Sequence, residues 1–292
     1  MVKPIPSISI VTPSFNQAAF LEATLRSVLD QQYPNLEYGV VDGGSTDGSV
    51  GILQQYANRL VWWVSEKDAG QYDAINKGFA RTSGDVMAWI NSDDQYLPWT
   101  FSVVAEIFAN CPEVEWLTSS YPLFWDNAGR VVNCFHYDGF NRKAFLRGAY
   151  MSDMPWWTRG WIMQEATFWR RSLWERAGGR LDTRLSIAAD FELWARFYQH
   201  AELYGVGVPL AGFRVHQTQK TGSQMETYRR EATEVLRQHG GRPPGPLRSF
   251  WLRKRDRLLT WFARKQGAGA GPRPHRHLVL HESRKGGWLI KR

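Results

Sequence analysis

Two periods of hydrophobic residues alternate along the first 115 residues of the chain. Short β-branched and apolar runs, typical of buried strands, are separated by stretches in which apolar residues recur every three or four positions, as on one face of a helix. The pattern predicts strands over residues 8–12, 38–41, 60–64 and 86–90, and helices over 17–32, 48–56, 72–80 and 98–111. Strands and helices that alternate at this spacing predict βαβ units around a mostly parallel sheet, which is an α/β fold.

The pattern is less regular after Glu115. It predicts strands over 117–120, 131–135, 203–206 and 211–215, and helices over 188–198 and 226–238. A run rich in Gly and Pro at 240–246 cannot continue a helix and marks a boundary. We therefore divide the chain into residues 1–115, residues 116–241 and an extension over residues 242–292.

Charge is distributed unevenly over the 292 residues. The formal net charge is +8, but residues 242–292 hold 14 Lys/Arg and 2 Asp/Glu, whereas residues 1–241 hold 22 and 26. Over residues 247–265, Leu, Phe and Trp recur at roughly helical spacing among basic residues, which is the composition of a helix on an anionic membrane. A solvated tail and a helix docked on a partner protein remain open as alternatives.

Two further observations limit the class of protein. The two cysteines, Cys111 and Cys134, exclude a disulfide scaffold and a four-cysteine zinc site, and they fit a reducing compartment. No stretch approaches the roughly 18 apolar residues of a membrane span. We therefore expect a cytoplasmic protein that meets a membrane only at its surface.

Carboxylates follow the predicted strands. Asp42 ends the second strand, Asp68 follows the third, and Asp93 and Asp94 follow the fourth. Ligands of open parallel sheets bind at the carboxyl ends of the strands, so these side chains are expected to meet at one edge. Gathered carboxylates repel one another, and a divalent cation that shares substrate phosphates is their natural partner. Asp47 is better explained as a helix cap.

Four segments resemble, in order and at the same spacing, signatures of the family 2 glycosyltransferases. They are Ser-Ile-Val-Thr-Pro-Ser-Phe-Asn at 9–16, Val-Asp-Gly-Gly-Ser-Thr-Asp-Gly at 41–48, Ser-Glu-Lys-Asp-Ala-Gly-Gln-Tyr-Asp-Ala-Ile-Asn-Lys-Gly at 65–78 and Asn-Ser-Asp-Asp at 91–94. The third is similar to the version in bacterial polysaccharide and O-antigen enzymes. The resemblance covers about residues 7–239 and implies a GT-A (Rossmann-like) fold. It also implies transfer of a hexose-type sugar with inversion, with Mn²⁺ or Mg²⁺ as cofactor.

Carried over by position, the resemblance assigns a nucleotide-sugar site to residues 1–115. The donor, UDP-linked by family habit, is expected to contact Pro13, Phe15, Asp42, Asp68, Lys77, Ser92 and Asp93. Pro13 and Phe15 would flank the base, and Asp42 would hydrogen-bond it.

The resemblance also assigns the metal site. Asp94 would bind the cation that bridges the diphosphate, and His216 could complete the metal shell. Ser92 stands where the family motif often has Asp. Lys77 could reach a phosphate as a point charge, but a solvated helix lysine explains it equally well.

Inversion requires one general base that removes the proton of the acceptor hydroxyl. Residues 188–194, Ala-Ala-Asp-Phe-Glu-Leu-Trp, resemble the family motif that carries this base, which makes Asp190 the candidate. An acid at a helix start also complements the helix dipole. Residues 160–169 resemble the segment that lines the acceptor side, so Trp161, Gln164 and Glu165 are expected there. Six tryptophans between 156 and 194 could supply flat walls for sugar rings.

These assignments predict a glycosyltransferase of cell-surface polysaccharide synthesis. Its acceptor would be a glycan or a lipid-linked glycan, and residues 247–265 would hold it at the inner face of the cell membrane. A nucleotidyltransferase shares the need for a nucleotide and a metal, although residues 13–16 supply no Gly-rich phosphate loop. A nucleic-acid-binding protein could use the basic tail, but acidic strand ends would repel phosphate backbones, so we expect no nucleic acid partner.

Overall fold

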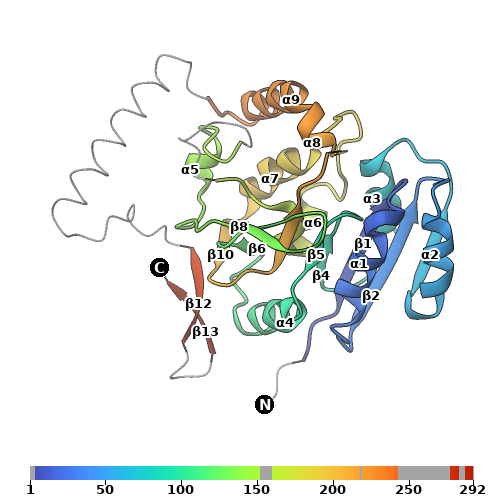
Figure 1. Cartoon of the computed structure of the whole chain (residues 1–292). Coiled ribbons are helices and arrows are strands. Elements are labelled where there is room, and N and C mark those ends of the chain that lie inside the picture. Colours follow the sequence, from blue (N-terminus) through green and yellow to red (C-terminus); the bar gives the residue numbers. More distant parts are fainter. Residues whose placement is uncertain (1–3, 152–159, 218, 243–276, 283–286, 292) are drawn as a thin grey trace.

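The computed structural model describes residues 4–151, 160–217, 219–242, 277–282 and 287–291. Strands of these residues form two sheets (Figure 1). The larger sheet has nine strands in the order β13-β12-β10-β6-β9-β4-β1-β2-β3. They are β1 (Ile8–Ser14), β2 (Leu36–Asp42), β3 (Trp62–Ser65), β4 (Val86–Trp89), β6 (Trp116–Ser119), β9 (Phe168–Arg170), β10 (Leu203–Val206), β12 (Leu278–Glu282) and β13 (Gly287–Lys291).

The nine-stranded sheet is mostly parallel, as predicted. Strand β9 runs antiparallel between β4 and β6, β13 runs antiparallel to β12, and the other pairings of this sheet are parallel. The predicted boundary at residues 115/116 falls before β6, and strands from both sides of it share the sheet.

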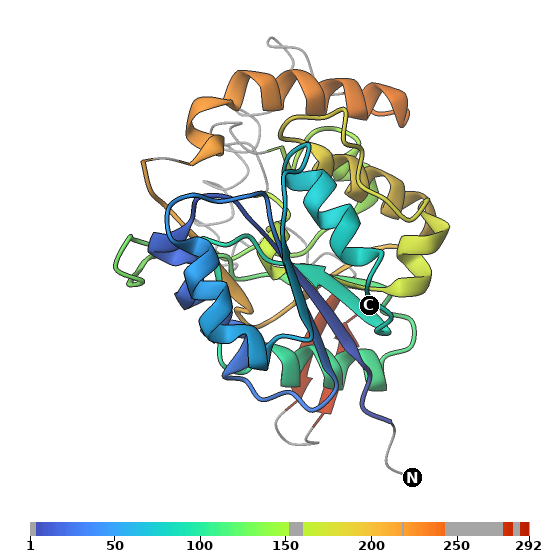
Figure 2. The ribbon, with the colours of Figure 1, turned by 90° about the vertical axis from the view of Figure 1, so that its right-hand side faces the viewer.

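Helices cover both faces of the sheet. They are α1 (Ala18–Leu29), α2 (Ser49–Tyr56), η1 (Ala57–Arg59), α3 (Gln71–Phe79), α4 (Thr100–Asn110), α5 (Arg142–Phe145), η2 (Gln164–Ala166), α6 (Arg171–Arg176), α7 (Ala189–His200), α8 (Lys220–Ser223) and α9 (Met225–Gln238). Figure 2 shows α1 and α2 on one side of β1–β3 and α3 on the other. The crossover from β3 to β4 thus places α3 opposite the first two helices.

A second, smaller sheet follows β4 along the chain. It has four strands in the order β5-β11-β7-β8, with β5 (Gln95–Tyr96), β7 (Leu123–Trp125), β8 (Val131–Cys134) and β11 (Ala211–Arg214). Strand β5 begins directly after Asp94, so the smaller sheet starts where the carboxyl end of β4 presents its acidic residues.

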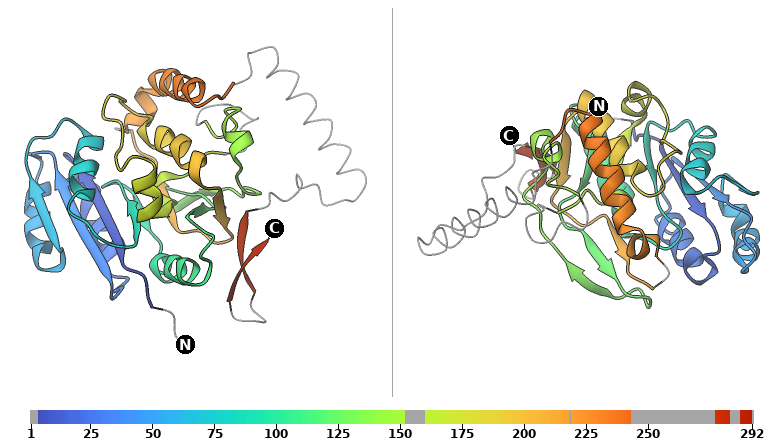
Figure 3. Two further views of the ribbon diagram at one scale, coloured as in Figure 1. Left: turned by 180° about the vertical axis from the view of Figure 1, so that it is seen from behind. Right: turned by 90° about the horizontal axis from the view of Figure 1, so that it is seen from above.

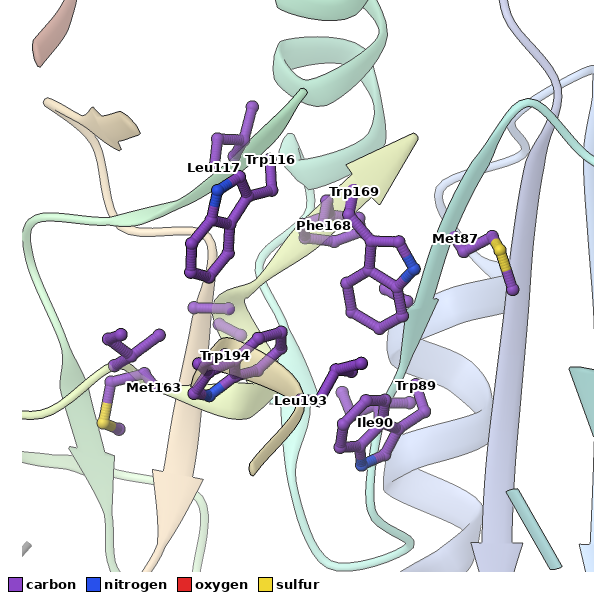
Figure 4. Packing of buried hydrophobic residues seen from close by; sticks show 14 of the residues in the cluster. Met87, Trp89, Ile90, Trp116, Leu117, Met163, Phe168, Trp169, Leu193 and Trp194 are labelled. Atoms are coloured by element: carbon purple, nitrogen blue, oxygen red, sulfur yellow. The ribbon is translucent and has the colours of Figure 1, made fainter. Parts of the chain in front are cut away.

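Four tryptophans form the centre of the core where the two halves of the chain meet (Figure 4). Trp89, Trp116, Trp169 and Trp194 are at most 1% exposed, and neighbouring rings lie 5.5 to 6.1 Å apart. The expectation that the tryptophans of this region wall a sugar site is therefore wrong for Trp169, Trp194 and the similarly buried Trp174. These rings are in the core because a large aromatic side chain gains most from the burial of its apolar area. Residues 156 and 157 lie outside the described residues.

The end of the chain also differs from the prediction of a helical extension over 242–292. Its described residues form the hairpin β12–β13, and β12 extends the large sheet beside β10. The backbone amides of Gly205 and Gly207 donate to the carbonyls of His277 and Val279, at 2.8 and 3.1 Å. The apolar run at 278–280 supplies a strand that the charge pattern concealed. Residues 247–265, the predicted membrane helix, lie outside the described residues.

No helix in the described ranges is both long enough and apolar enough to cross a membrane.

The docking of β12 can be tested by two neighbouring substitutions. Val279 is fully buried, whereas Leu280, which faces the other way, is 38% exposed. We expect Val279→Asp to lower the free energy of unfolding by about 3–5 kcal/mol, because it buries a carboxylate without a partner, and Leu280→Asp to lower it by about 1 kcal/mol or less. Denaturant titration of both variants measures this, and equal losses would contradict the placement of β12 in the sheet.

Candidate active site

Asp42, the last residue of β2, closes the loop that follows it. It is fully buried, and its carboxylate accepts hydrogen bonds from the backbone amides of Gly44 (3.1 Å) and Ser45 (2.9 Å). The hydroxyls of Ser45 (2.5 Å) and Ser65 (2.7 Å) also donate to it. Asp42 therefore shapes the loop in this structure, and its contact with a base stays a prediction.

Asp47 caps helices, as predicted. Its carboxylate accepts from the backbone amide of Ser49 (3.1 Å) at the start of α2 and from that of Ala18 (2.9 Å) at the start of α1. A carboxylate at a helix start satisfies free amides and complements the dipole. One side chain thus ties together the loops that follow β1 and β2.

The other residues predicted at the base and ribose lie around these loops. Phe15 is 60% exposed just after β1, whereas Pro13 is buried within the strand. Asp68 lies against Gly43, where a Cβ would come within 2.9 Å of its Oδ2. The absence of a side chain at Gly43 therefore leaves space for the Asp68 carboxylate, and the Gly43 amide donates to the carbonyl of Ser14, the residue before Phe15, at 2.8 Å.

Lys77 is occupied by ion pairs on the surface of α3. Its ammonium lies 3.2 Å from Asp73 and 3.4 Å from Glu66. These contacts are those of a solvated helix lysine. Ser92 is buried, with 4% of its surface exposed.

Asp93 and Asp94 follow β4 and are held by Arg214 of β11. The backbone amide of Arg214 donates to Oδ1 of Asp94 (2.9 Å), and its guanidinium donates to the carbonyl of Asp93 (2.8 Å) and lies 5.0 Å above the ring of Phe20. Asp94 is 1% exposed. Burial raises its pKa well above the ordinary value, and the charges of Asp93 and Glu165 raise it further.

Gln164 and Glu165 of η2 face the same group of carboxylates. Gln164 donates to the carbonyl of Trp89 (2.7 Å) and accepts from Asn91 (3.2 Å), which also donates to Asp94 (3.3 Å). Glu165 is 3% exposed, and its Oε1 makes no hydrogen bond with the residues described. Burial, helped by the charges of Asp190 and Asp93, raises the pKa of Glu165 to about 8. Glu165 is therefore near enough to both Asp93 and the predicted base, Asp190, for their charges to act on it.

Asp190 lies in the first turn of α7. Burial raises its pKa to about 6, although the backbone amide of Phe191 donates to its carboxylate at 2.7 Å. Burial raises the pKa of Tyr72 on α3 well above its ordinary value, and the charge of Asp190 raises it further. The Tyr72 hydroxyl is hydrogen-bonded to the backbone of Ala189. A carboxylate with this pKa can accept a proton near neutral pH.

The segment before α7 is held by one carboxylate of α9. Glu231 accepts hydrogen bonds from the backbone amides of Ser186 (2.9 Å), Ile187 (3.1 Å) and Ala188 (3.1 Å). These three amides precede the first turn of α7, so Glu231 sets the position from which Asp190 projects.

His216 contacts Asp93. Its Nε2 lies 2.9 Å from Oδ2 of Asp93, its ring is 4.7 Å from that of Phe20, and its side chain is 4% exposed. Metal ligation by His216 stays a prediction, because in this structure Nε2 faces a carboxylate.

Asp93 and Asp94 fit a divalent cation that is also bound by substrate phosphates. In the ranges that the structure describes, no three His, Cys, Asp or Glu side chains are grouped so as to hold a metal by themselves. Mg²⁺ is usually bound through one or two carboxylates together with substrate phosphates. Asp93 and Asp94, with Glu165 nearby, fit this way of binding, in which substrate phosphates supply the other ligands.

A cavity of about 570 Å³ lies elsewhere. Its lining includes Pro6, Tyr33, Phe101 and Glu106 and none of the predicted site residues. Pro6 precedes β1, so this cavity opens at the amino end of the strand and the acidic group lies at the opposite end.

Trp161, expected on the acceptor side, packs between the rings of Phe124 and Phe135, at 5.6 and 6.5 Å. Trp161 thus packs on aromatic residues of the smaller sheet, and its contact with an acceptor stays a prediction.

Asn91, Tyr72, Arg214 and Glu231 support the site but were missed in the sequence. Arg214 had a visible signal, because it is a single cation in an apolar run from 210 to 215. Glu231 had none, because an acid on a helix surface gives no sign of which distant backbone it will cap.

Comparison with known proteins decides the family. The model of glycosyl transferase family 2 matches residues 9–145. An uncharacterized glycosyltransferase of Mycobacterium tuberculosis is 33% identical over 198 residues, which are 65% of this chain and 68% of the relative. The chain belongs to glycosyl transferase family 2. It is therefore a glycosyltransferase, which replaces the nucleotidyltransferase alternative.

Other family 2 relatives are similar over shorter or more divergent stretches. TuaG of Bacillus subtilis, a putative teichuronic acid biosynthesis glycosyltransferase, is 40% identical over 94 residues, which are 31% of this chain and 37% of TuaG.

Two solved structures share the GT-A fold. A fragment of S. aureus TarS in complex with UDP-GlcNAc superposes with a TM-score of 0.57 at 17% identity, over 80% of this chain and 66% of the fragment. The mannosyltransferase PcManGT of Pyrobaculum calidifontis, in complex with GDP-Man and Mn²⁺, gives 0.57 at 18% identity, over 93% and 77%.

The raised pKa of Glu165 predicts a pH-dependent stability in the metal-free glycosyltransferase. The carboxyl binds a proton more tightly in the folded than in the unfolded state, so its stabilisation is complete below pH 4.5 and is lost as the pH rises through about 8. Glu165→Gln removes this loss, at about 1.4 kcal/mol per pKa unit. We expect the variant to match the wild type at about pH 5 and to exceed its free energy of unfolding at about pH 8.

Denaturant titration with a metal chelator present measures this difference. Glu175→Gln, an exposed acid on α6, is the matched control and should leave the pH profile unchanged. Parallel profiles for the wild type and Glu165→Gln would contradict a raised pKa of the buried Glu165 carboxyl.

Proposed function

We propose that this family 2 enzyme transfers a sugar, with inversion, from a nucleoside-diphosphate sugar to a hydroxyl of a glycan or lipid-linked glycan. The observation that carries the proposal is the proximity of four acids from three elements: the charges of Asp93 and Glu165 act on Asp94, and those of Asp190 and Asp93 act on Glu165. Burial, in addition, raises the pKa of Asp190 to about 6. Structural neighbours that bind UDP-GlcNAc or GDP-Man support a nucleotide-sugar donor.

The donor would bind over the loops that follow β1, β2 and β4. The exposed ring of Phe15 offers a stacking surface for the base, and Asp68 with Asp93 would receive the ribose. Asp42 acts in this proposal by shaping its loop and by hydrogen-bonding the base once that loop adjusts. A uracil base is favoured by the TarS complexes, which hold UDP or UDP-GlcNAc.

Asp94 would hold Mn²⁺ or Mg²⁺ together with the donor diphosphate. A divalent cation there supplies Lewis-acid stabilisation of the charge that develops on the leaving diphosphate. Arg214 orients Asp94 through its backbone amide, and Asn91 holds the other oxygen. His216 positions Asp93 and is the candidate for a further ligand.

Asp190 acts as the general base. The acceptor oxygen attacks the anomeric carbon, the bond from that carbon to the diphosphate oxygen breaks, and the acceptor proton passes to Asp190. A pKa of about 6 leaves the carboxylate mostly ionised at neutral pH while keeping it basic enough to take the proton. Glu231 holds the start of α7, which keeps the Asp190 carboxylate in its position.

The acceptor would lie on the side of η2 and the smaller sheet. Glu165, protonated at neutral pH, can donate a hydrogen bond to an acceptor oxygen, whereas Gln164 is committed to Trp89 and Asn91. Trp161 supplies an apolar wall. Residues 1–115 thus serve the donor and 116–241 mainly the acceptor.

The setting of the reaction is proposed from the chain's composition and its relatives. Nine Lys/Arg against one Asp over residues 243–276 would hold the enzyme on anionic lipid at the inner face of the cell membrane. The likeness to TuaG supports a role in cell-surface polysaccharide synthesis.

Asp94→Asn and Asp190→Asn form a matched pair that separates the two roles. Each removes one negative charge without changing side-chain size. We expect Asp94→Asn to lose the Mn²⁺-dependent part of donor binding, and Asp190→Asn to keep donor binding but to lose about 10²–10⁴-fold in the rate of transfer. Thermal-shift titration with a panel of UDP- and GDP-sugars measures binding, and chromatography of released nucleotide measures transfer.

Wild-type transfer by Asp190→Asn would overturn the assignment of the base. If Mn²⁺ strengthened donor binding by Asp94→Asn as much as it does in the wild type, the assignment of Asp94 to the metal site would be overturned.

A further inference from the structure

An exposed apolar strand projects beside the proposed acceptor site. Strand β8 is the outer strand of the smaller sheet, and all four of its residues are exposed. Val131 is 53% exposed, Val132 is 58% exposed, and Phe135 just after the strand is 41% exposed. Figure 3 shows the β7–β8 hairpin standing away from the body of the molecule in the view from above. In the described part of the chain no further strand pairs with its outer edge.

The hairpin is held firmly to the proposed active site. Arg214, which orients Asp93 and Asp94, also donates to the carbonyls of Asp126 and Asn127 at the start of the turn, each at 3.0 Å. The turn is closed by the carboxylate of Asp126, which accepts from the backbone and the guanidinium of Arg130. The apolar strand therefore keeps a set position relative to the catalytic residues.

Basic residues lie next to this strand along the chain. Residues 130–147 hold four Lys/Arg and one Asp, although residues 1–241 as a whole are acidic. Arg142 and Lys143 of α5, and Arg147 after it, are exposed. Figure 1 shows β8 and α5 in the same half of the molecule, away from α1–α3. An apolar edge with a cationic border is the composition of a surface that meets anionic lipid.

The end of α5 is joined to the origin of the basic tail. The backbone amide of Arg242 donates to the carbonyl of Leu146 at the end of α5, at 2.9 Å. From there the chain enters residues 243–276, which hold nine Lys/Arg, one Asp and two Trp. A bilayer that attracts the tail would therefore meet α5 where the tail begins.

We propose that β8 and α5 form a membrane-contact surface for an anionic phospholipid bilayer, with Val131, Val132 and Phe135 entering the headgroup region. Arg142, Lys143 and Arg147 would contact lipid phosphates. The inference rests on the proposed function, because it places the acceptor site beside the bilayer in which a lipid-linked acceptor is anchored. The β7–β8 hairpin would connect the active site to the bilayer. Its turn contacts the guanidinium of Arg214, which also contacts Asp93, and its strand β8 would contact lipid.

The test uses the full chain and vesicles of phosphatidylglycerol with phosphatidylcholine. Val131→Asp/Val132→Asp places two carboxylates in the apolar strand, and Arg142→Glu/Lys143→Glu reverses the charge of α5. We expect each double variant to sediment with vesicles at least about tenfold more weakly than the wild type. Val61→Asp, which changes an equally exposed valine next to β3 at the far edge of the large sheet, is the control and should sediment as the wild type does.

Donor hydrolysis in solution separates this inference from the proposed function. It should be unchanged in both double variants, because their side chains are outside the catalytic group, whereas failure of the proposed function would appear as no metal-dependent hydrolysis in the wild type.

Three results would overturn the membrane surface. The first is unchanged sedimentation of both double variants with vesicles. The second is an equally large loss of sedimentation for Val61→Asp, because that loss would reflect added negative charge alone. The third is dissociation of a dimer by Val131→Asp/Val132→Asp with unchanged sedimentation, measured by light scattering, which would assign the strand edge to a second copy of the chain.

Discussion

The burial of several carboxylates close to one another is the constraint on which the rest of this structure depends. Asp94 and Glu165 are buried and Asp190 is half-buried, and burial raises the pKa of each above its ordinary value. Such an arrangement costs folding free energy unless protons or a cation compensate. A protein core does not collect these groups for stability, so the cost is best understood as preparation for a bound cation and a transferred proton.

The buried tryptophans explain how the fold withstands this cost. Trp89 precedes Asp93 by four residues, Trp169 follows Glu165 by four, and Trp194 follows Asp190 by four. The three rings pack against one another in the core. Each of the three chain segments that carry these carboxylates is therefore fixed in the core by a tryptophan four residues away from its acidic residue. Arg214 and Glu231 add hydrogen bonds that set the directions of Asp94 and of α7.

Sequence reasoning found what is local and missed what is distant. Strand runs that end in Asp predicted the parallel sheet and the acidic edge, because periodicity and turn chemistry act within a few residues. The prediction of tryptophans around a sugar and the prediction of a helical C-terminal extension were less successful. Composition alone does not show whether an aromatic ring lies in the core or at a ligand, or which strand an apolar run will pair with. Asp42 illustrates the limit: a motif marks the residue, but only the fold shows that its oxygens close their own loop.

Cation binding by the acidic residues can be measured as the rise in the thermal unfolding midpoint that Mn²⁺ causes in the presence of UDP, taken at about pH 5 and about pH 8. Metal and protons compete for the same carboxylates, so the account predicts a clearly larger rise at about pH 8. A rise of equal size at both pH values would contradict the view that the buried acidic group is built to receive a cation.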